Sequence, residues 1–167
     1  MTRRSQHGLL VCSSLNLVSA SLGAWLSVTT HLPARFGGLL SGNDVLRDFL
    51  LLNGTALSPD LAMLLDQIVL IVCATRAGRG GMMGVVGLTL LGAVTILGQL
   101  GEPIAFRALS PATFNAPQAV LVGTNLLSSL GMFTLGAVAW RNRRMDADDL
   151  MRMERGEQAP TLTGVRP

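Results

Sequence analysis

Four long apolar stretches are separated by segments that hold almost all of the charged residues. A helix rises 1.5 Å per residue, so about 20 apolar residues cross the roughly 30 Å hydrocarbon core of a bilayer. The pattern predicts an all-α, left-handed bundle of four transmembrane helices. The predicted spans are about residues 8–30, 59–75, 81–100 and 117–140.

The long segment between the first two stretches, residues 31–58, contains a further helical pattern. Asn43 is a suitable N-cap, Asp44 follows in the first turn, and Gly54 is a suitable C-terminal stop. The residues between them are expected to separate into an apolar face and a charged face. The apolar face comprises Val45, Leu46, Phe49 and Leu50, and the charged residues are Arg47 and Asp48. We expect a short amphipathic surface helix in this first outer loop.

The start of the second span has the residues of a helix N-terminus. Ser58 is a suitable cap, Pro59 fits the first helical position, and Asp60 lies near the positive end of the helix dipole. The first span instead has an arginine pair before its apolar run, as a secretory signal peptide also does. The run extends to Thr30, which is longer than the 7–15 residues of a signal core. Retention of this helix is therefore expected, with cleavage near Ser21 as the alternative.

The distribution of arginines predicts the orientation in the membrane. Seven arginines lie on one side of the predicted spans and three on the other. Positive residues near span ends stay in the cytoplasm, so both termini are predicted to be cytoplasmic. The seven are Arg3, Arg4, Arg76, Arg79, Arg141, Arg143 and Arg144, and the three are Arg35, Arg47 and Arg107. This divides the chain into a membrane domain, residues 1–144, and a cytoplasmic tail, residues 145–167. The last ten residues of the tail are expected to be disordered.

The composition agrees with a membrane location, and this location affects how the net charge is interpreted. Hydrophobic residues make up 49% of the chain, charged residues 14%, and the mean hydropathy is +0.47. Soluble domains carry about 25% charged residues. The net charge of +3 does not indicate nucleic-acid binding, because the arginines lie at span ends rather than along one polar face. The excess of Arg, Ala, Gly and Leu, without lysine or tyrosine, favours a bacterial inner membrane.

Small and polar residues recur at helical spacing in three of the spans. Such residues let helix backbones approach and form hydrogen bonds across the contact, so they are interpreted as packing faces. They are Cys12, Asn16, Ser19, Gly23 and Ser27 in the first span, Gly81, Gly84, Gly92, Thr95 and Gln99 in the third, and Asn125, Ser129 and Gly136 in the fourth.

Asp66 is the residue that the membrane tolerates least, because an acid at the bilayer centre costs roughly 2.5–3.5 kcal/mol. We therefore predict that Asp66 is buried in the bundle and faces Glu102 or Asn125. The candidate cluster in the outer half of the bundle comprises Asp66, Gln99, Glu102, Asn125 and Arg107. Two interpretations remain open. Either Asp66 or Glu102 forms an ion pair with Arg107 that holds loop to bundle, or the cluster binds a ligand, an ion or a proton.

Several kinds of chemistry are disfavoured by the sequence. Cys12 and Cys73 form no C-x-x-C pair, and His7 and His31 flank opposite ends of one span, which argues against thiol exchange and bis-histidine haem. Two carboxylates without a nearby histidine make a weak metal site. Because no G-x-S-x-G, H-E-x-x-H or phosphate-loop motif is found, we assign no catalytic residue, cofactor or metal.

The function expected from these observations is a small, multi-pass, non-enzymatic inner-membrane protein. It would act as an accessory, a scaffold or a subunit that binds a partner or a lipid. The alternative is a small transporter or ligand-binding bundle that uses the outer polar cluster around Asp66, and a membrane-embedded enzyme is least favoured. The expected partners are the lipid bilayer and a protein partner or second copy of the chain, but not nucleic acid.

Overall fold

The computed structural model describes residues 3–32, 35–36, 40–41, 44–50 and 54–154 of the 167-residue chain. In this part of the chain the regular structure is helical, apart from one strand pair and one isolated bridge. Strand β1 (Arg35–Phe36) pairs in antiparallel fashion with β2 (Leu40–Ser41), so that Arg35 lies opposite Ser41. The prediction of an all-α fold is confirmed at this level.

Among the described residues, three helices are long and apolar enough to cross a membrane. They are α1 (Arg3–Thr29), α4 (Gly78–Gly101) and α6 (Ala116–Glu154). Their apolar parts are Ser5–Thr29, Gly78–Gly101 and Ala116–Asn142. α1 and α4 begin earlier than predicted. α6 extends far past the predicted end at residue 140, and its 39 residues measure about 58 Å.

The second predicted span, residues 59–75, corresponds to α3 (Leu61–Ala74), which begins two residues later and ends one residue earlier than predicted. Its 14 residues measure about 21 Å, less than the roughly 30 Å hydrocarbon core. The prediction that Ser58 caps this helix and that Pro59 opens it is wrong. Asp60 is the N-cap, and its side chain accepts a 2.8 Å hydrogen bond from the Met63 backbone N–H. Ser58 is instead held in a bridge with Thr55, which keeps its backbone out of the helix.

The expected helix of the first loop is present as α2 (Val45–Leu50), with a different cap and a different buried face. One oxygen of Asp44 accepts 3.1 Å bonds from the backbone N–H groups of Leu46 and Arg47. Asn43, the predicted cap, lies outside the described residues. The predicted apolar face is wrong, because Asp48 is buried together with Val45 while Leu46 and Leu50 are exposed. Gly54 has the positive φ, +69°, expected of a helix stop.

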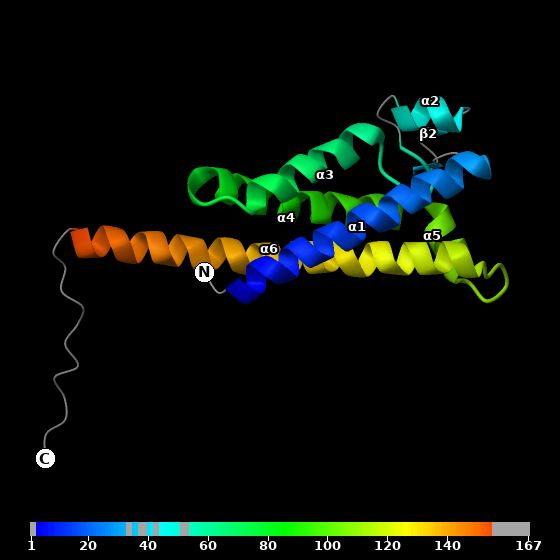
Figure 1. Ribbon diagram of the computed structural model, residues 1–167. Helices are drawn as coiled ribbons and strands as arrows, with labels where there is room; N and C mark the ends of the chain where they lie inside the picture. Colours follow the sequence, from blue (N-terminus) through cyan, green and yellow to red (C-terminus); the bar gives the residue numbers. More distant parts are fainter. Residues whose placement is uncertain (1–2, 33–34, 37–39, 42–43, 51–53, 155–167) are drawn as a thin grey trace, which may run out of the picture.

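The helices lie side by side, with α6 packed against both α1 and α4 (Figure 1). α3 packs on α4 and α1. A second short helix, α5 (Pro103–Leu109), was not predicted and connects α4 to the loop before α6. We call the end of the bundle that holds α2 and α5 the α5 end. The start of α1 and the turn between α3 and α4 lie at the opposite end, and α6 continues beyond that end (Figure 1).

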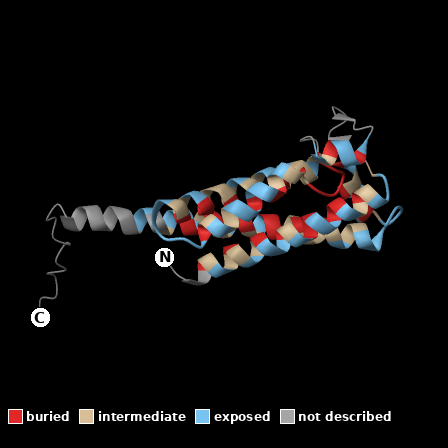
Figure 2. Ribbon diagram, turned by 45° about the horizontal axis from the view of Figure 1, so that its top comes forward, coloured by how far each residue is buried: buried red, intermediate tan, exposed pale blue. Residues whose placement is uncertain are grey.

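Most residues of the predicted small-residue faces are buried, whereas Cys12 and Gln99 are half-buried. Figure 2 shows buried positions concentrated on the sides of the long helices that face one another. A Cβ at Gly92 of α4 would lie 2.8 Å from the Ser129 carbonyl oxygen of α6, so only glycine permits this approach. The buried members of the three faces are Asn16, Ser19, Gly23, Ser27, Gly81, Gly84, Gly92, Thr95, Asn125, Ser129 and Gly136.

The interior consists of two apolar clusters with polar side chains between them. The cluster away from the α5 end contains Leu9, Ala74, Val85, Leu88, Met132 and Ala139. The cluster near α5 contains Leu57, Ala105, Ala108 and Val122. Two groups of buried polar side chains contain the candidates for function.

Candidate functional site

The first polar region is a hydrogen-bonded network centred on Asn16 of α1. Its side-chain amide nitrogen lies 3.1 Å from the Asn125 side-chain oxygen and 3.1 Å from the Ser128 hydroxyl. The Ser129 hydroxyl lies 2.9 Å from the same nitrogen. All four residues are buried. An amide nitrogen carries two hydrogens, so these acceptors on α6 outnumber the donors that Asn16 offers them.

Gln67 of α3 connects the third helix to this network. Its amide nitrogen donates to the Asn16 side-chain oxygen at 3.1 Å and to the Ser13 backbone oxygen at 2.9 Å. Only 2% of Gln67 is exposed. The network therefore joins α1, α3 and α6 through amides and hydroxyls that bond to one another, as expected of a packing device in a membrane bundle. We call these residues (Asn16, Gln67, Asn125, Ser128 and Ser129) the amide network.

The prediction that Asp66 is buried and faces Glu102 or Asn125 is wrong. The Asp66 side chain is exposed on the outside of α3, between the exposed Leu65 and the neighbouring Val69. Successive residues of a helix are turned by about 100°, and Gln67 takes the inward position instead. The spacing of Gln67 from Leu64 and Ala74, three and seven residues away, could have identified the buried face of α3.

The second polar region begins with the segment that precedes α3. Thr55, Ala56, Leu57 and Ser58 are all buried, although their backbone is not helical. The Thr55 N–H donates to the Ser58 oxygen at 2.8 Å, which closes a tight turn at Ala56 and Leu57. The turn lies directly on α1, where a Cβ at Gly23 would lie 2.5 Å from the Leu57 carbonyl oxygen. Irregular backbone at this depth is tolerated where protein surrounds it or a cavity adjoins it.

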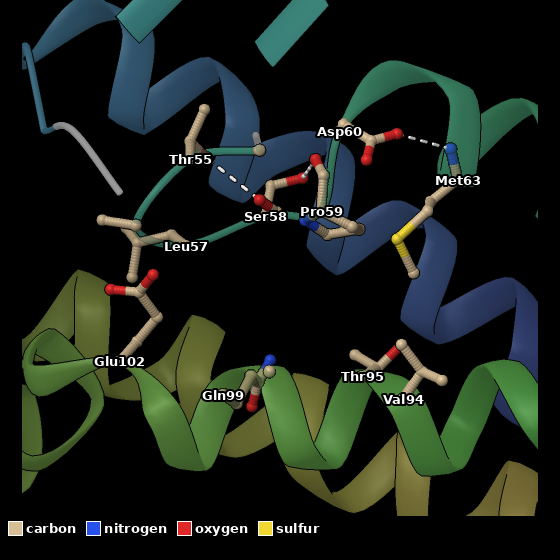
Figure 3. A pocket seen from close by; sticks show the side chains of 13 residues that line it. Thr55, Leu57, Ser58, Pro59, Asp60, Met63, Val94, Thr95, Gln99 and Glu102 are labelled. Atoms are coloured by element: carbon tan, nitrogen blue, oxygen red, sulfur yellow. Dashed lines mark hydrogen bonds between the residues drawn. The ribbon is translucent and has the colours of Figure 1, made fainter. Parts of the chain in front are cut away.

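A cavity of about 220 Å³ lies between this segment and the second half of α4 (Figure 3). We call it the inner cavity. Its polar lining residues are Thr55, Ser58, Asp60, Thr95, Gln99 and Glu102, and its larger apolar ones are Leu57, Met63 and Val94. Figure 3 shows the Glu102 carboxyl group rising from α4 toward Leu57, with the Gln99 side chain beside it on the same helix.

The charged lining of the inner cavity is acidic. Asp60 and Glu102 are 7% and 9% exposed, so both carboxyl groups are largely removed from bulk solvent. The described residues that line the inner cavity include no arginine and no histidine. Hydroxyl groups and carboxylates accept hydrogen bonds, so this lining is suited to a cation or to a group rich in N–H donors.

Gln99 adds an amide with unused hydrogen-bonding capacity. Its side-chain oxygen is buried, and no hydrogen-bond partner is found for it among the described residues. Its amide nitrogen is turned toward the segment before α3 (Figure 3). In Figure 3 the Gln99 oxygen points away from this segment, so the amide presents its N–H groups to the cavity.

A second cavity of about 390 Å³ adjoins the first at the α5 end, and we call it the outer cavity. Ala56 and Glu102 line both cavities, so they form the boundary between them. Arg107 is the basic residue of the outer cavity, and Asn115 and Gln118 contribute amides to it. Its apolar lining is Leu32, Ala56, Pro103 and Ile104.

The structure brings together only part of the predicted cluster. Gln99 and Glu102 line the inner cavity, and Arg107 joins Glu102 at the outer one. Asn125 belongs to the amide network and Asp66 lies outside both regions. Sequence reasoning missed Gln67, and it assigned Asp60 only to the start of a helix. Within the described residues, no group of three or more His, Cys, Asp or Glu side chains could hold a metal ion.

Comparison with other proteins adds no further identification. No protein-family model, curated protein or solved structure matches this chain.

Proposed function

We propose that the chain crosses a bacterial inner membrane four times, with α3 and the segment before it forming a broken fourth span. α3 alone is too short to cross, but the buried segment 54–60 continues its path toward the α5 end. Non-helical backbone inside a membrane protein is acceptable when protein or a cavity covers it, which is the environment of this segment. Trp140 supports an interface at the opposite end, where the Arg144 guanidinium lies 4.3 Å from the centre of its ring.

Both termini are proposed to be cytoplasmic, on the basis of the seven-to-three division of arginines. Topology reporters fused after Asn53 and after Asn115 should report an external location. Fusions after Arg79 and after Arg144 should report a cytoplasmic one. An external signal at Arg79 would contradict the four-span proposal, because α3 would then fail to cross.

We propose that this membrane protein is a non-enzymatic binding protein and that the inner cavity is its ligand site. The observation that supports this proposal is the cavity itself, which is lined by the two buried carboxyl groups of Asp60 and Glu102 and by the Gln99 amide. A scaffold gains nothing from a cavity, since the atoms that line it lose packing contacts. The ligand-binding alternative is therefore preferred over a purely structural role, with Asp60, Gln99 and Glu102 replacing Asp66 at its centre.

Gly98 provides a test that leaves the polar lining intact. Gly98 lines the inner cavity, and a Cβ added there would meet nothing within 4 Å. Gly98→Leu should therefore fill the cavity without a backbone clash. Gly123→Leu is the matched control, since Gly123 also has open space around it but does not line the cavity.

The readout is thermal unfolding of the purified full chain in detergent, with native mass spectrometry of bound molecules. The probes are a total polar lipid extract and a panel of small amines, amino acids and carboxylates. At least one probe should raise the unfolding temperature of the wild type and of Gly123→Leu, but not that of Gly98→Leu. Equal stabilisation of Gly98→Leu, or no stabilisation by any probe, would overturn the proposal.

A second candidate function, self-association through the end of α6, is supported by the length of that helix. At about 58 Å, α6 is nearly twice as long as the hydrocarbon core is thick, so its last turns project beyond the bundle (Figure 1). The mass of the detergent-solubilised protein would be compared between the full chain and a chain ending at Arg144. If the extension mediates self-association, only the full chain forms the larger species, whereas equal masses exclude this role.

A further inference from the structure

We propose that the two cavities form one divided site for a phosphate-linked primary ammonium group, supplied by the headgroup of an aminophospholipid. This inference rests on the proposed ligand-binding function and specifies its ligand. The ammonium group would enter the inner cavity, the phosphate would lie at Arg107, and Glu102 would contact the ligand at the boundary between them.

The charges of the two cavities are arranged for a ligand of this polarity. The inner cavity presents Asp60 and Glu102, and the outer cavity adds Arg107 on the far side of Glu102. A purely anionic ligand would meet the two carboxylates, and a purely cationic one would leave the arginine unused. A ligand with a positive end and a negative end separated by a short linker uses both cavities.

The inner cavity favours a primary ammonium over a quaternary one. Quaternary ammonium groups are recognised by the faces of aromatic rings, and no aromatic residue is found among the described residues that line this cavity. A primary ammonium has three N–H donors. The lining contains acceptor oxygens in the carboxylates of Asp60 and Glu102 and in the hydroxyls of Thr55 and Ser58, and each of these groups can accept further bonds beside those it already makes.

The position of the site corresponds to the headgroup layer of a bilayer. Both cavities lie toward the α5 end, where the aromatic rings of Trp25, Phe106 and Phe114 are 66%, 60% and 63% exposed. Of these three, Trp25 is the residue type that is enriched at the interface between lipid and water, so its exposed ring supports this position. Leu32 and Ile104 give the outer cavity apolar walls, which suit the glycerol and the first acyl carbons of a lipid.

The size of the inner cavity is sufficient for the ammonium end of such a headgroup. Its volume of about 220 Å³ is well above the roughly 10–15 Å³ that a single water molecule requires. An aminoethyl group fits this space, and the phosphate remains with Arg107 in the larger outer cavity. The same chemistry could come from a soluble phosphoamine, so the experiment includes both sources.

The test measures binding to the purified full chain by native mass spectrometry and by thermal unfolding. The probes are short-chain phosphatidylethanolamine, phosphatidylcholine and phosphatidylglycerol, with glycerophosphoethanolamine as the soluble source. Phosphatidylethanolamine should bind about tenfold more tightly than either other lipid, since only its headgroup donates charge-assisted hydrogen bonds to the carboxylates. Competition by glycerophosphoethanolamine at equal concentration would identify a soluble ligand, and its failure to compete would identify the lipid. Either result supports the assigned chemistry.

Two variants separate the two halves of the site. Glu102→Gln should remove the preference for phosphatidylethanolamine over phosphatidylcholine, while leaving the affinity for phosphatidylglycerol unchanged or higher. Arg107→Gln should lower the affinity for all three lipids by about tenfold, because all three carry the phosphate. Arg79→Gln, at the opposite end of the bundle, is the control and should change none of these values.

The outcomes distinguish a failure of the assigned ligand from a failure of the proposed ligand-binding function. Equal binding of the three lipids, or unchanged selectivity in a folded Glu102→Gln protein, would overturn the ammonium assignment. If Glu102→Gln fails to fold, the test uses Gly98→Leu instead. Continued selective binding of phosphatidylethanolamine by Gly98→Leu would overturn the inference. If another probe binds the wild type and not Gly98→Leu, the ligand site stands and only its assigned ligand is wrong.

Discussion

The bundle contains two buried polar regions that the membrane should tolerate for different reasons. In the amide network, Asn16 and Gln67 donate to groups on neighbouring helices at 2.9–3.1 Å. At the inner cavity, Gln99 has a buried oxygen without a described partner, and Asp60 and Glu102 adjoin open volume. Burial alone therefore does not separate structure from function here. What separates them is that the side chains of the amide network bond to one another across helices, whereas Thr55, Ser58, Asp60 and Thr95 bond to nearby backbone and line a cavity.

The two regions also differ in their backbone. The amide network lies entirely on helices, where backbone groups bond within each helix and only side chains need partners. The inner cavity has an irregular segment as one wall, and Gly23 lets that segment approach α1. The helical region can gain stability from polar side chains. The irregular segment depends on the surrounding protein and the adjoining cavity for its place in the bundle.

The largest effect is expected for Gln67→Leu in the amide network. The substitution leaves the Asn16 side-chain oxygen without the donor that now lies at 3.1 Å, in a buried position. The free energy of unfolding in detergent should fall by about 2–3 kcal/mol, the cost of an unsatisfied buried group together with lost interhelical bonds. Unfolding would be measured by circular dichroism in a denaturant titration. Unchanged or greater stability would show that the network is not a packing device.

A smaller loss is expected for Gly23→Ala, which affects the wall of the inner cavity. The added Cβ would lie 2.5 Å from the Leu57 carbonyl oxygen, so the turn before α3 must shift. Overpacking of this kind should lower the free energy of unfolding by about 1–2 kcal/mol and weaken ligand binding as well. Gly123→Ala is the control, because a Cβ there meets no atom within 4 Å. Equal stability of Gly23→Ala and Gly123→Ala would show that the turn does not contact α1.

The packing faces could be predicted from the sequence, whereas the site could be predicted only in part. Small and polar residues at helical spacing identified the buried positions of α1, α4 and α6, because close helix packing requires them. The buried turn at Ala56 and Leu57 has no periodic pattern, so it was assigned to an outer loop. Glu102 and Gln99 were grouped in the prediction and line the same cavity, because both lie at the C-terminal end of α4. The prediction for Asp66 was wrong because it considered only the free-energy cost of placing an acid in the bilayer. It did not consider the rotation of α3 about its axis, which turns Gln67 inward.

Gln99→Leu should change the free energy of unfolding in the opposite direction to Gln67→Leu. The buried Gln99 oxygen lacks a described partner, so replacing the amide with an apolar group removes a desolvation cost. The free energy of unfolding should rise by roughly 0.5–1 kcal/mol, while ligand binding at the inner cavity weakens. Both quantities come from denaturant titrations with and without phosphatidylethanolamine. A loss of stability as large as that of Gln67→Leu would mean that Gln99 belongs to a closed network too.

The smallest effect is expected for Asp66→Asn. The Asp66 side chain is exposed on α3, so its substitution removes no buried contact of the chain. The free energy of unfolding should stay within about 0.5 kcal/mol of the wild type, and binding at the inner cavity should not change. Asn125→Asp is the informative contrast, because it places a charge beside Asn16 inside the amide network and should be strongly destabilising. A large, concentration-dependent effect of Asp66→Asn would instead show that a second copy covers this face of α3. An acid exposed on an apolar helix would then be explained by a partner, since lipid leaves its charge unpaired.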